Sequence, residues 1–300
     1  MSGLTEGIWR VADPKITLAS VASMVIGAAS AAADGPLSIG WLVLTVVGIF
    51  FFEAAKNASG EIFDFDSGTD AAVTDADRSP FSGGKRVLID GLMTRRQTAL
   101  VAATFYALGA AVGLLIVWGR APEVLLFGVV GAALAFFYHA PPLKLSYRGL
   151  GEAAVALAYG PLIAAGTYLV QRQTIASRHL WLALPLGLLI AAFLLVNELP
   201  DHDADASVGK RTLVVRLGKR RGATLFATLV ATAFVLTVLA PAWGLSPWVG
   251  LGLVGFVPAA RAAWRLRHAK TTAEIVPAQA WTLIAFLLFA LGAAAGTLLG

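Results

Sequence analysis

The 300-residue chain contains no cysteine. This absence excludes disulfide frameworks, thiolate nucleophiles, iron–sulfur clusters and cysteine-based zinc sites, and it leaves the redox compartment open. Histidine is scarce too: His139, His179, His202 and His268 are scattered and lack the spacing of metal ligands. A metal site in this chain should therefore be built from oxygen ligands.

Charged residues are also few. They make up 14% of the chain, whereas hydrophobic residues make up 58% and the mean hydropathy is +0.76. An ordinary globular chain has about 25% charged residues. A buried core does not need so much apolar surface, so the surplus must face lipid. The composition predicts a polytopic membrane protein and excludes a disordered, collagen-like or soluble dinucleotide-binding chain.

The hydrophobic pattern predicts about nine membrane-spanning helices, since each span needs roughly 20 mostly apolar residues. The expected fold is all-α, a helical bundle in which residues 1–300 form a single domain. We expect the first span to be retained rather than cleaved as a signal peptide. The nine candidate spans lie at about 15–34, 38–56, 97–118, 122–140, 150–170, 179–199, 223–243, 247–263 and 277–299.

The basic residues predict the orientation. With a cytoplasmic N-terminus, only Arg120, Arg172 and Arg178 of the 23 Lys and Arg residues fall outside, which leaves 20 on the inner side. The net charge of +5 is thus explained by membrane topology and gives no reason to expect nucleic acid as a partner. The long inner connections, about 57–96 and 200–222, hold most of the acids. A third, shorter inner connection lies at 141–149. We expect a multi-pass cell-membrane protein with these three segments as a cytoplasmic cap.

The first acidic cluster begins where the second span ends. It reads Asn57-Ala-Ser-Gly-Glu61-Ile-Phe-Asp64-Phe-Asp66-Ser-Gly68-Thr-Asp70. Helical spacing places Asn57, Glu61 and Asp64 on one face, with Asp66 on the opposite face. The Ser-Gly pair at residues 67–68 predicts that the helix stops there and lets Asp70 fold back.

The second acidic cluster, Asn197-Glu-Leu-Pro-Asp201-His-Asp203-Ala-Asp205, begins where the sixth span ends. Asn197, Asp201 and Asp205 follow each other at intervals of four residues and share a helix face, whereas Asp203 points away. Like charges at this spacing destabilise a helix, so we expect each row of acids on a shared helix face, an acidic stripe, to bind a cation. Oxygen ligands without His or Cys favour Mg²⁺ over zinc.

A basic pair follows each acidic cluster through a glycine-containing turn: Lys85 and Arg86 after the first, Lys210 and Arg211 after the second. Acids that hold Mg²⁺ beside Lys and Arg are typical of a diphosphate site. Positive-inside topology explains each pair alone equally well. The repeat of acids, glycine and basic pair suggests two pseudo-equivalent halves with a site between them.

A third polar segment, Tyr138 to Glu152, joins the fourth and fifth spans on the same side. Lys144 and Arg148 are candidate catalytic cations there. Tyr138 and Tyr147 are candidates for binding the acceptor or the prenyl chain, although interfacial anchoring explains such tyrosines as well.

These segments resemble the UbiA superfamily of intramembrane aromatic prenyltransferases, and most of all its 1,4-dihydroxy-2-naphthoate polyprenyltransferases of menaquinone synthesis. The resemblance covers nearly the whole chain. It rests on Asn57 to Asp70, on Gly-Lys-Arg-Val-Leu-Ile-Asp-Gly-Leu from Gly84, on YxxPPLKLSYRGLGE from Tyr138, and on NELPDHDADASVGKRTLVVRL from Asn197.

The resemblance implies a helical bundle around a lipid-open central cavity, in which two acidic motifs bind Mg²⁺ and prenyl diphosphate. Asp64 and Asp201 would be the central catalytic acids. The chain departs from the family at Gly60, where relatives often have Asn or Asp, and at Glu198, where naphthoate enzymes often have a second Asn. By matching position, the metal ligands would be Asn57, Glu61, Asp64 and Asp70 in the first motif and Asn197, Asp201 and Asp205 in the second.

The implied reaction is Mg²⁺-dependent transfer of a polyprenyl group from its diphosphate to an aromatic acceptor. The acceptor stays open between dihydroxynaphthoate and 4-hydroxybenzoate, homogentisate, a chlorophyll precursor or haem, as do the prenyl length and the oligomeric state. A membrane transporter is an alternative class, but it would place ionisable residues deep within the spans. A CDP-alcohol phosphotransferase is disfavoured because its DGxxAR pattern does not occur.

Overall fold

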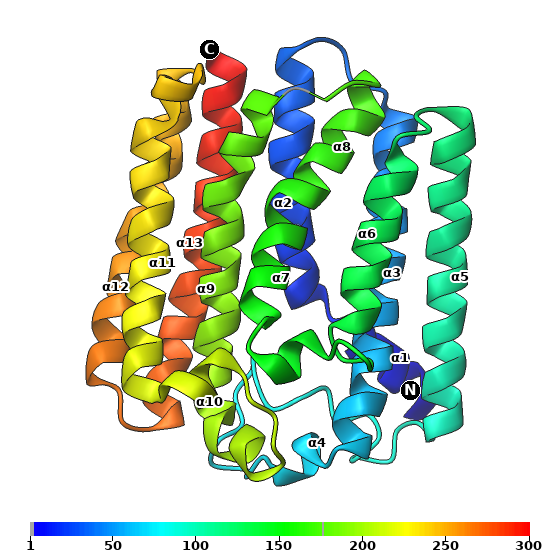
Figure 1. Ribbon diagram of the computed structural model, residues 1–300, viewed down its shortest axis with the longest axis vertical. Helices are drawn as coiled ribbons and strands as arrows, with labels where there is room; N and C mark the ends of the chain where they lie inside the picture. Colours follow the sequence, from blue (N-terminus) through cyan, green and yellow to red (C-terminus); the bar gives the residue numbers. More distant parts are fainter. Residues whose placement is uncertain (1–2, 176) are drawn as a thin grey trace.

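The computed structural model describes residues 3–175 and 177–300. Over these residues the chain forms helices and connecting loops, without a β-strand. The long helices run side by side along one axis (Figure 1). Helices pair most of their backbone groups internally, which is what a hydrocarbon environment demands.

The N-terminal part of the chain contains a bent helix pair and three further helices of the bundle. A short helix after the Ser-Gly stop covers the lower end of the bundle in Figure 1. The elements are α1 (Gly3–Ala12), α2 (Pro14–Ala33), α3 (Ile39–Asp66), α4 (Thr69–Ala72), α5 (Arg95–Gly119) and α6 (Val124–Phe137).

The C-terminal part opens with the short 3₁₀ helix η1, continues with a helix interrupted by the π-helical turn η2, and closes with the 28-residue α13. The elements are η1 (Leu145–Arg148), α7 (Gly151–Leu157), η2 (Ala158–Leu162), α8 (Ile163–Arg172), α9 (Ser177–Ser207), α10 (Leu213–Leu217), α11 (Lys219–Leu239), η3 (Ala240–Trp243), η4 (Pro247–Gly255), α12 (Phe256–His268) and α13 (Thr272–Leu299).

Six helical stretches among the described residues are long and apolar enough to cross a membrane, and a seventh if the bent pair α1–α2 counts as one span. The count of nine is therefore not confirmed. The fourth expected span is the apolar but short α6, of 14 residues. The eighth is divided between the 3₁₀ segment η4 and the 13-residue α12. Apolar composition alone does not separate such short or tightly wound segments from regular spans.

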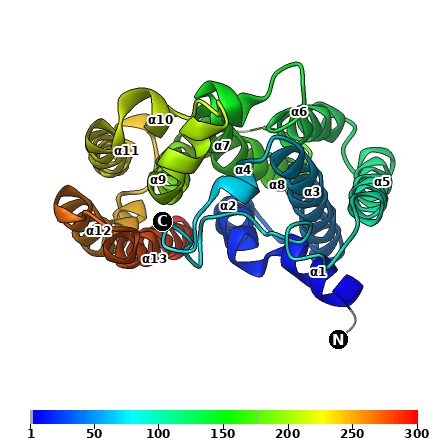
Figure 2. The same cartoon turned by 90° about the horizontal axis from the view of Figure 1, so that it is seen from below.

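Both acidic clusters lie on helices that extend beyond the expected spans. Helix α3 continues to Asp66, where Ser67 caps it and Gly68 adopts a left-handed conformation, φ = 80°. Helix α9 continues through Pro200 to Ser207. Seen from below, the helices surround a centre that α4 and the connection after it cross (Figure 2). Helix α4 contacts both α3 and α9, so it joins the two acid-bearing ends.

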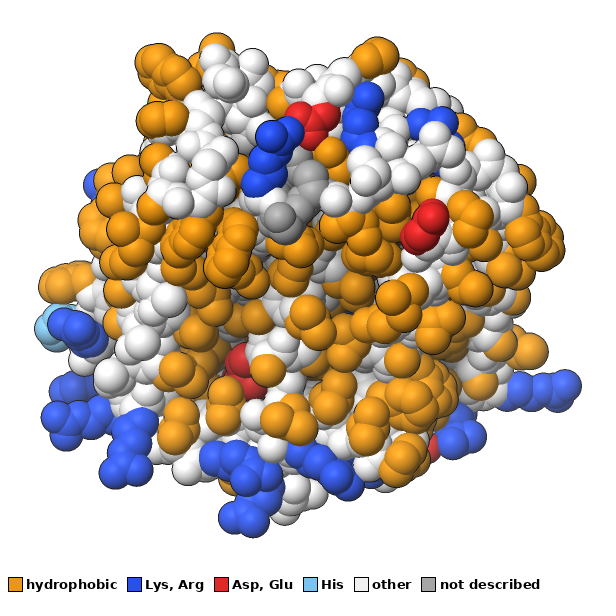
Figure 3. Space-filling view, turned by 45° about the horizontal axis from the view of Figure 1, so that its top comes forward, with side chains coloured by type: hydrophobic (Ala, Val, Ile, Leu, Met, Phe, Trp, Pro, Cys, Tyr) orange, Lys and Arg blue, Asp and Glu red, His pale blue; other side chains and the backbone are white. Residues whose placement is uncertain are grey.

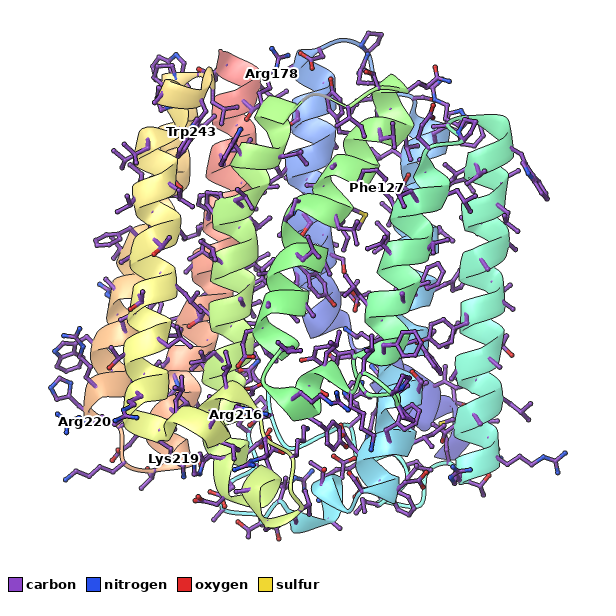
Figure 4. The ribbon with its side chains drawn as sticks, viewed as in Figure 1. Phe127, Arg178, Arg216, Lys219, Arg220 and Trp243 are labelled. Atoms are coloured by element: carbon purple, nitrogen blue, oxygen red, sulfur yellow. The ribbon has the colours of Figure 1, made fainter. Side chains whose placement is uncertain are left out.

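The surface separates by chemistry along the bundle axis. A broad hydrophobic band covers the face shown in Figure 3, and Lys and Arg side chains gather along its lower edge. Arg216, Lys219 and Arg220 lie at the lower end and Arg178 at the upper end (Figure 4). Large apolar side chains such as Trp118 and Leu126 are mostly exposed, 81% and 67%, on helices that have no protein partner on that side. The protein is an integral membrane protein.

The two GxxxG motifs differ in what they do. Gly292 and Gly296 of α13 lie against the backbone of η4, where an added Cβ would come within 2.4 Å of the Leu251 carbonyl and 1.9 Å of the Trp248 carbonyl. This is the close helix packing that the motif typically indicates. Gly109 and Gly113 of α5 line an internal cavity: an added Cβ at Gly109 would come 3.0 Å from the Phe52 ring of α3, whereas one at Gly113 would meet nothing within 4 Å.

Candidate active site

A cavity of about 400 Å³ runs inside the bundle between α3, α5, α6, α7, α8 and α9. At its lower end it is lined by Asn57, Glu61, Asp64 and Lys85, and its upper wall is apolar, with Ile116 and Val170 near the opposite end of the bundle. Phe127 projects from α6 towards α8 in this upper part (Figure 4). The cavity thus connects an acidic end with a long apolar channel.

The first acidic stripe lies as its spacing predicted. Asn57, Glu61 and Asp64 all line the cavity. Glu61 accepts the backbone N–H of Leu88 at 3.2 Å, which ties the connection after α4 to α3. Asp66 points away and forms an ion pair with Arg95 at 2.8 Å on the exposed side. The helical face therefore separates acids that face the cavity from one that faces water.

Asp70 folds back over this end, as the Ser-Gly stop predicted, and its side chain is buried. Gly84 lies so close that an added Cβ would be 2.3 Å from the Asp70 Oδ1 atom, and its φ of 76° also favours glycine. Burial and the carboxylates of Asp64 and Glu61 raise the pKa of Asp70 to about 8. An unpaired carboxyl in such surroundings gains from a cation.

The second acidic stripe meets the connection that follows the first. Asn197 lines the cavity, and the Gly83 backbone N–H donates to Asp201 Oδ2 at 3.3 Å. Asp205 is buried, whereas Asp203 is exposed and forms an ion pair with Lys219 at 2.9 Å. The predicted separation between the Asp201 face and the Asp203 face is thus present.

Lys210 joins the two motifs. Its Nζ lies 3.6 Å from Asp64 Oδ1 and 3.5 Å from Asp205 Oδ1. Burial opposes the charge on the ammonium, but Asp64 and Asp205 raise its pKa well above the ordinary value. Asp64, Asp205 and Lys210 therefore form one electrostatic unit, even though they come from the two halves of the chain.

The oxygen atoms at this end fit a hard divalent cation. One buried oxygen on each of Asp70, Asn197 and Asp201 has no hydrogen-bond partner within the described part of the chain. Over the same residues, no three acids or histidines converge closely enough to hold an ion on their own. Mg²⁺ typically takes one or two carboxylates and completes its shell with water and substrate phosphates, so this arrangement suits it when a diphosphate is present.

The two predicted basic pairs are each divided by the structure. Lys85 lines the cavity and forms an ion pair with Asp13, and burial lowers its pKa. Arg86 turns to the Asp70 carbonyl, 3.1 Å away, and to Asp90. Arg211 is exposed, and only its backbone N–H reaches inwards, to the Tyr147 carbonyl at 3.1 Å. One cation of each pair therefore faces the acids.

The third polar segment contributes Tyr138 and Tyr147 to this end. Tyr138 lines the cavity, and the Tyr147 hydroxyl donates to Asp64 Oδ1 at 2.6 Å. The ammonium groups of Lys144 and Lys210 lie 5.2 and 5.3 Å from the centre of the Tyr147 ring. Arg148 is exposed. Tyr147 thus holds Asp64 in place and sits between two lysines.

Four ionisable residues that line the cavity were not among the predicted site residues: Glu53, Lys56, His139 and Tyr159. His139 Nε2 lies 3.6 Å from Asp64 Oδ2, and its ring fills the space beside Gly60, where an added Cβ would be 2.7 Å from it. Gly60, where the chain departs from the family pattern, was the one sequence feature that could have pointed to a bulky neighbour such as His139. Lys56 could have been noticed as well, because it stands one helical turn from Glu53 at the end of a span.

Comparisons with known proteins agree with this geometry. Residues 20–284 match the model of the UbiA prenyltransferase family. A 1,4-dihydroxy-2-naphthoate octaprenyltransferase from Mycobacterium tuberculosis is 32% identical over 285 residues, 95% of this chain and 94% of the relative. A 2-carboxy-1,4-naphthoquinone phytyltransferase from Synechocystis is 25% identical over 85% of this chain and 80% of the relative.

Solved structures share the fold. A UbiA homolog from Archaeoglobus fulgidus, bound to GPP and Mg²⁺, superimposes with a TM-score of 0.64 at 16% identity, over 96% of this chain and 99% of that one. The same homolog bound to DMAPP and Mg²⁺ gives a TM-score of 0.66. The family model covers most of the chain, the acidic motifs meet at one end of an internal cavity, and the fold is the same. The chain belongs to the UbiA prenyltransferase family.

Proposed function

We propose that this protein transfers a polyprenyl group from prenyl diphosphate to an aromatic acceptor in a Mg²⁺-dependent reaction, with 1,4-dihydroxy-2-naphthoate as the acceptor. One observation carries the proposal: a single cavity joins an end rich in acids and lysines to a long apolar channel. This shape suits a substrate with a diphosphate at one end and a hydrocarbon chain at the other.

The acidic end would receive the diphosphate. Asn57, Glu61, Asp64 and Asp70 from one side and Asn197, Asp201 and Asp205 from the other would hold Mg²⁺, and the solved UbiA homolog with GPP and Mg²⁺ supports this assignment. Bound there, Mg²⁺ would neutralise charge on the diphosphate as it leaves. Lys85 at the cavity wall and Lys210 beside both motifs add positive charge at the same end.

The apolar channel would hold the prenyl chain and protect the allylic cation. Phe52, Phe193, Tyr138 and Tyr159 line the cavity above the acids. Aromatic faces stabilise a passing carbocation, and apolar walls exclude the water that would quench it. The glycines along α5 and α6, such as Gly113 and Gly128, keep the channel wide.

The proposed acceptor is supported by relatives whose names specify one. Naphthoate prenyltransferases from Mycobacterium tuberculosis, Bacillus subtilis and Haemophilus influenzae are among them. The relatives include both octaprenyl and phytyl transferases, so the prenyl chain is proposed only as a long isoprenoid. With dihydroxynaphthoate, carbon dioxide is lost as the new carbon–carbon bond forms.

We propose a cell-membrane location with the N-terminus and the acid-bearing end on the cytoplasmic side. The charge asymmetry supports this orientation, because Arg120, Arg172 and Arg178 cluster at the end opposite the acids. A water-soluble diphosphate head would then be reached from the cytoplasm while its tail stays in hydrocarbon.

The decisive experiment is a mass-spectrometric assay of the purified protein in lipid nanodiscs. Geranyl diphosphate and Mg²⁺ would be offered with dihydroxynaphthoate, 4-hydroxybenzoate or homogentisate in separate reactions. We expect a prenylated, decarboxylated product from dihydroxynaphthoate, dependent on Mg²⁺. Product from another acceptor alone would overturn the acceptor assignment, and no product from any acceptor would overturn the activity.

A further inference from the structure

A second polar cluster lies in the cavity above the acidic motifs. It consists of Glu53 and Lys56 on α3, Ser20 on α2 and Tyr159 on η2. Lys56 Nζ donates to Glu53 Oε2 at 3.0 Å and to the Tyr159 hydroxyl at 2.8 Å, and Ser20 Oγ donates to Glu53 Oε1 at 2.5 Å. Glu53 is 6% exposed and Tyr159 6%, and both line the cavity with Lys56.

This cluster lies on the apolar side of the proposed diphosphate site. Glu53 precedes Asn57 by four residues and Glu61 by eight on the same cavity-facing stripe of α3. At a rise of about 1.5 Å per residue, these steps are about 6 and 12 Å along the helix. The first prenyl carbon is bonded to the diphosphate and points into the channel. Glu53 therefore lies about one helical turn above Asn57, and Lys56, the residue before Asn57, reaches up to it. An acceptor ring placed beside the first prenyl carbon would meet this pair.

The cluster retains hydrogen-bonding capacity towards the cavity. A lysine ammonium has three donors, and the two bonds above use two of them. Each carboxylate oxygen accepts more than one hydrogen bond, and each Glu53 oxygen accepts one in the contacts above. The pair has no net charge, because one Lys⁺ balances one Glu⁻. A neutral hydroxyl, which donates and accepts, matches such a pair, whereas a carboxylate would bring an uncompensated charge into an apolar cavity.

The backbone break at η2 places Tyr159 in this cluster. Gly160 departs from helical geometry at ψ = −107°, and Pro161 follows it. The carbonyl of Tyr159 accepts a hydrogen bond from the hydroxyl of Ser23 on α2. An added Cβ at Gly160 would lie 2.9 Å from the Gly187 Cα of α9, so close packing fixes the break. Breaks of this kind are frequent at functional sites.

We propose that the Glu53–Lys56 pair, positioned by Ser20 and Tyr159, binds a ring hydroxyl of the aromatic acceptor. Glu53 accepts the hydroxyl proton in a hydrogen bond, and Lys56 donates to the same oxygen. This inference rests on the proposed function and names the group by which the acceptor is recognised. The bond to Glu53 also makes the ring a better nucleophile, because it shifts electron density from the O–H bond towards the ring.

The test compares acceptor and prenyl diphosphate kinetics in matched variants. Lys56→Met and Glu53→Gln should each raise the KM for dihydroxynaphthoate about 10- to 100-fold, which is the usual effect of losing a hydrogen bond to a charged group. The KM for geranyl diphosphate should change less than twofold. Ser59→Ala is the control: Ser59 lies on the same helix and does not line the cavity, and its hydroxyl contacts Tyr106 and the backbone carbonyl of Lys56 but not the Lys56 or Glu53 side chain.

The double variant Glu53→Gln/Lys56→Met guards against a folding defect, because it leaves no unpaired charge. A second probe is 1,4-dimethoxy-2-naphthoate, which keeps the carboxylate but has no hydroxyl. In the wild type, its inhibition constant should be about 10- to 100-fold higher than the KM for dihydroxynaphthoate. In the double variant the two constants should be similar.

Three results separate the possible failures. Equal competition by the dimethoxy compound in the wild type would overturn hydroxyl recognition. An increase in the KM for geranyl diphosphate, without an increase for the acceptor, would assign the pair to the diphosphate. Failure of the wild type to prenylate any aromatic acceptor would instead overturn the proposed function.

Discussion

Lys210 lies 3.6 Å from Asp64, and the two residues come from opposite acidic motifs. The same ammonium reaches Asp205 at 3.5 Å. One positive charge thus links the two halves of the site, in addition to the contacts that α4 makes with both α3 and α9. Substitutions on this unit should affect the diphosphate end specifically.

Removal of the Lys210 charge should weaken diphosphate binding. Lys210→Ala deletes one charge-assisted hydrogen bond, worth roughly 1.5–3 kcal/mol, or about 10- to 100-fold in kcat/KM for prenyl diphosphate. Lys219→Ala is the control, because Lys219 is exposed and pairs with Asp203 on the outer face. Equal small effects at both positions would contradict a role of Lys210 in diphosphate binding and leave membrane topology as the explanation of its charge.

Asp64→Asn and Asp201→Asn should each lower turnover by at least about 100-fold at saturating Mg²⁺, since both remove a charge that faces the site and neither changes the side-chain size. Asp203→Asn should be nearly silent because this carboxylate faces water. Steady-state rates of variants with unchanged melting temperature make the comparison. Near-normal turnover of either site variant would refute its assigned role.

Gly84→Ala should displace the Asp70 carboxylate, which would lie 2.3 Å from the new Cβ. We expect kcat/KM for prenyl diphosphate to fall about tenfold and the Mg²⁺ concentration for half-maximal rate to rise. Gly91→Ala is a matched control: its φ of 66° gives similar backbone strain, but nothing lies within 4 Å of its added Cβ. If both variants behave alike, backbone strain and not the Asp70 contact is responsible.

Gly296→Ala should destabilise the bundle, because the added Cβ would lie 1.9 Å from the Trp248 carbonyl. Overpacking of this kind costs about 1–3 kcal/mol. A lower melting temperature in detergent, with normal activity of the folded fraction, is the expected result. Gly250→Ala, whose Cβ would meet nothing within 4 Å, should melt like the wild type. An unshifted melting temperature for Gly296→Ala would argue against tight α13–η4 packing.

Topology reporters fused after residues 90, 145 and 212 should all give a cytoplasmic signal, and a fusion after residue 120 should give an external one. The three inner sites lie in the connections at the acid-bearing end, and Arg120 ends α5 at the opposite end. An external signal at any inner site would contradict the proposed orientation.

The sequence was sufficient to predict what depends on local spacing. The shared face of Asn57, Glu61 and Asp64, the stop at Gly68 and the outward position of Asp203 all follow from helical geometry, and the structure confirms them. The direction of loop side chains does not follow from spacing. Lys85 is drawn to Asp13 and Arg211 stays exposed because these positions depend on contacts between distant segments.

The number of spans and the role of Lys56 could not be predicted from the sequence, for physical reasons. The number of spans depends on how tightly each apolar segment winds, and η4 has the composition of a span but a 3₁₀ geometry packed against α13. The role of Lys56 depends on tertiary contacts with Tyr159, which is far along the chain. At the end of a span, a single lysine gives the same signal as a topology determinant.

The π-turn at η2 also acts as a phase shift between α7 and α8. An extra residue in a helical turn rotates everything that follows by about 100° relative to a regular helix. Helices α7 and α8 therefore present faces that no single helical wheel describes. Deleting one residue between Ala158 and Leu162 would change this offset, and we expect the α8 residues that line the cavity to turn away from it.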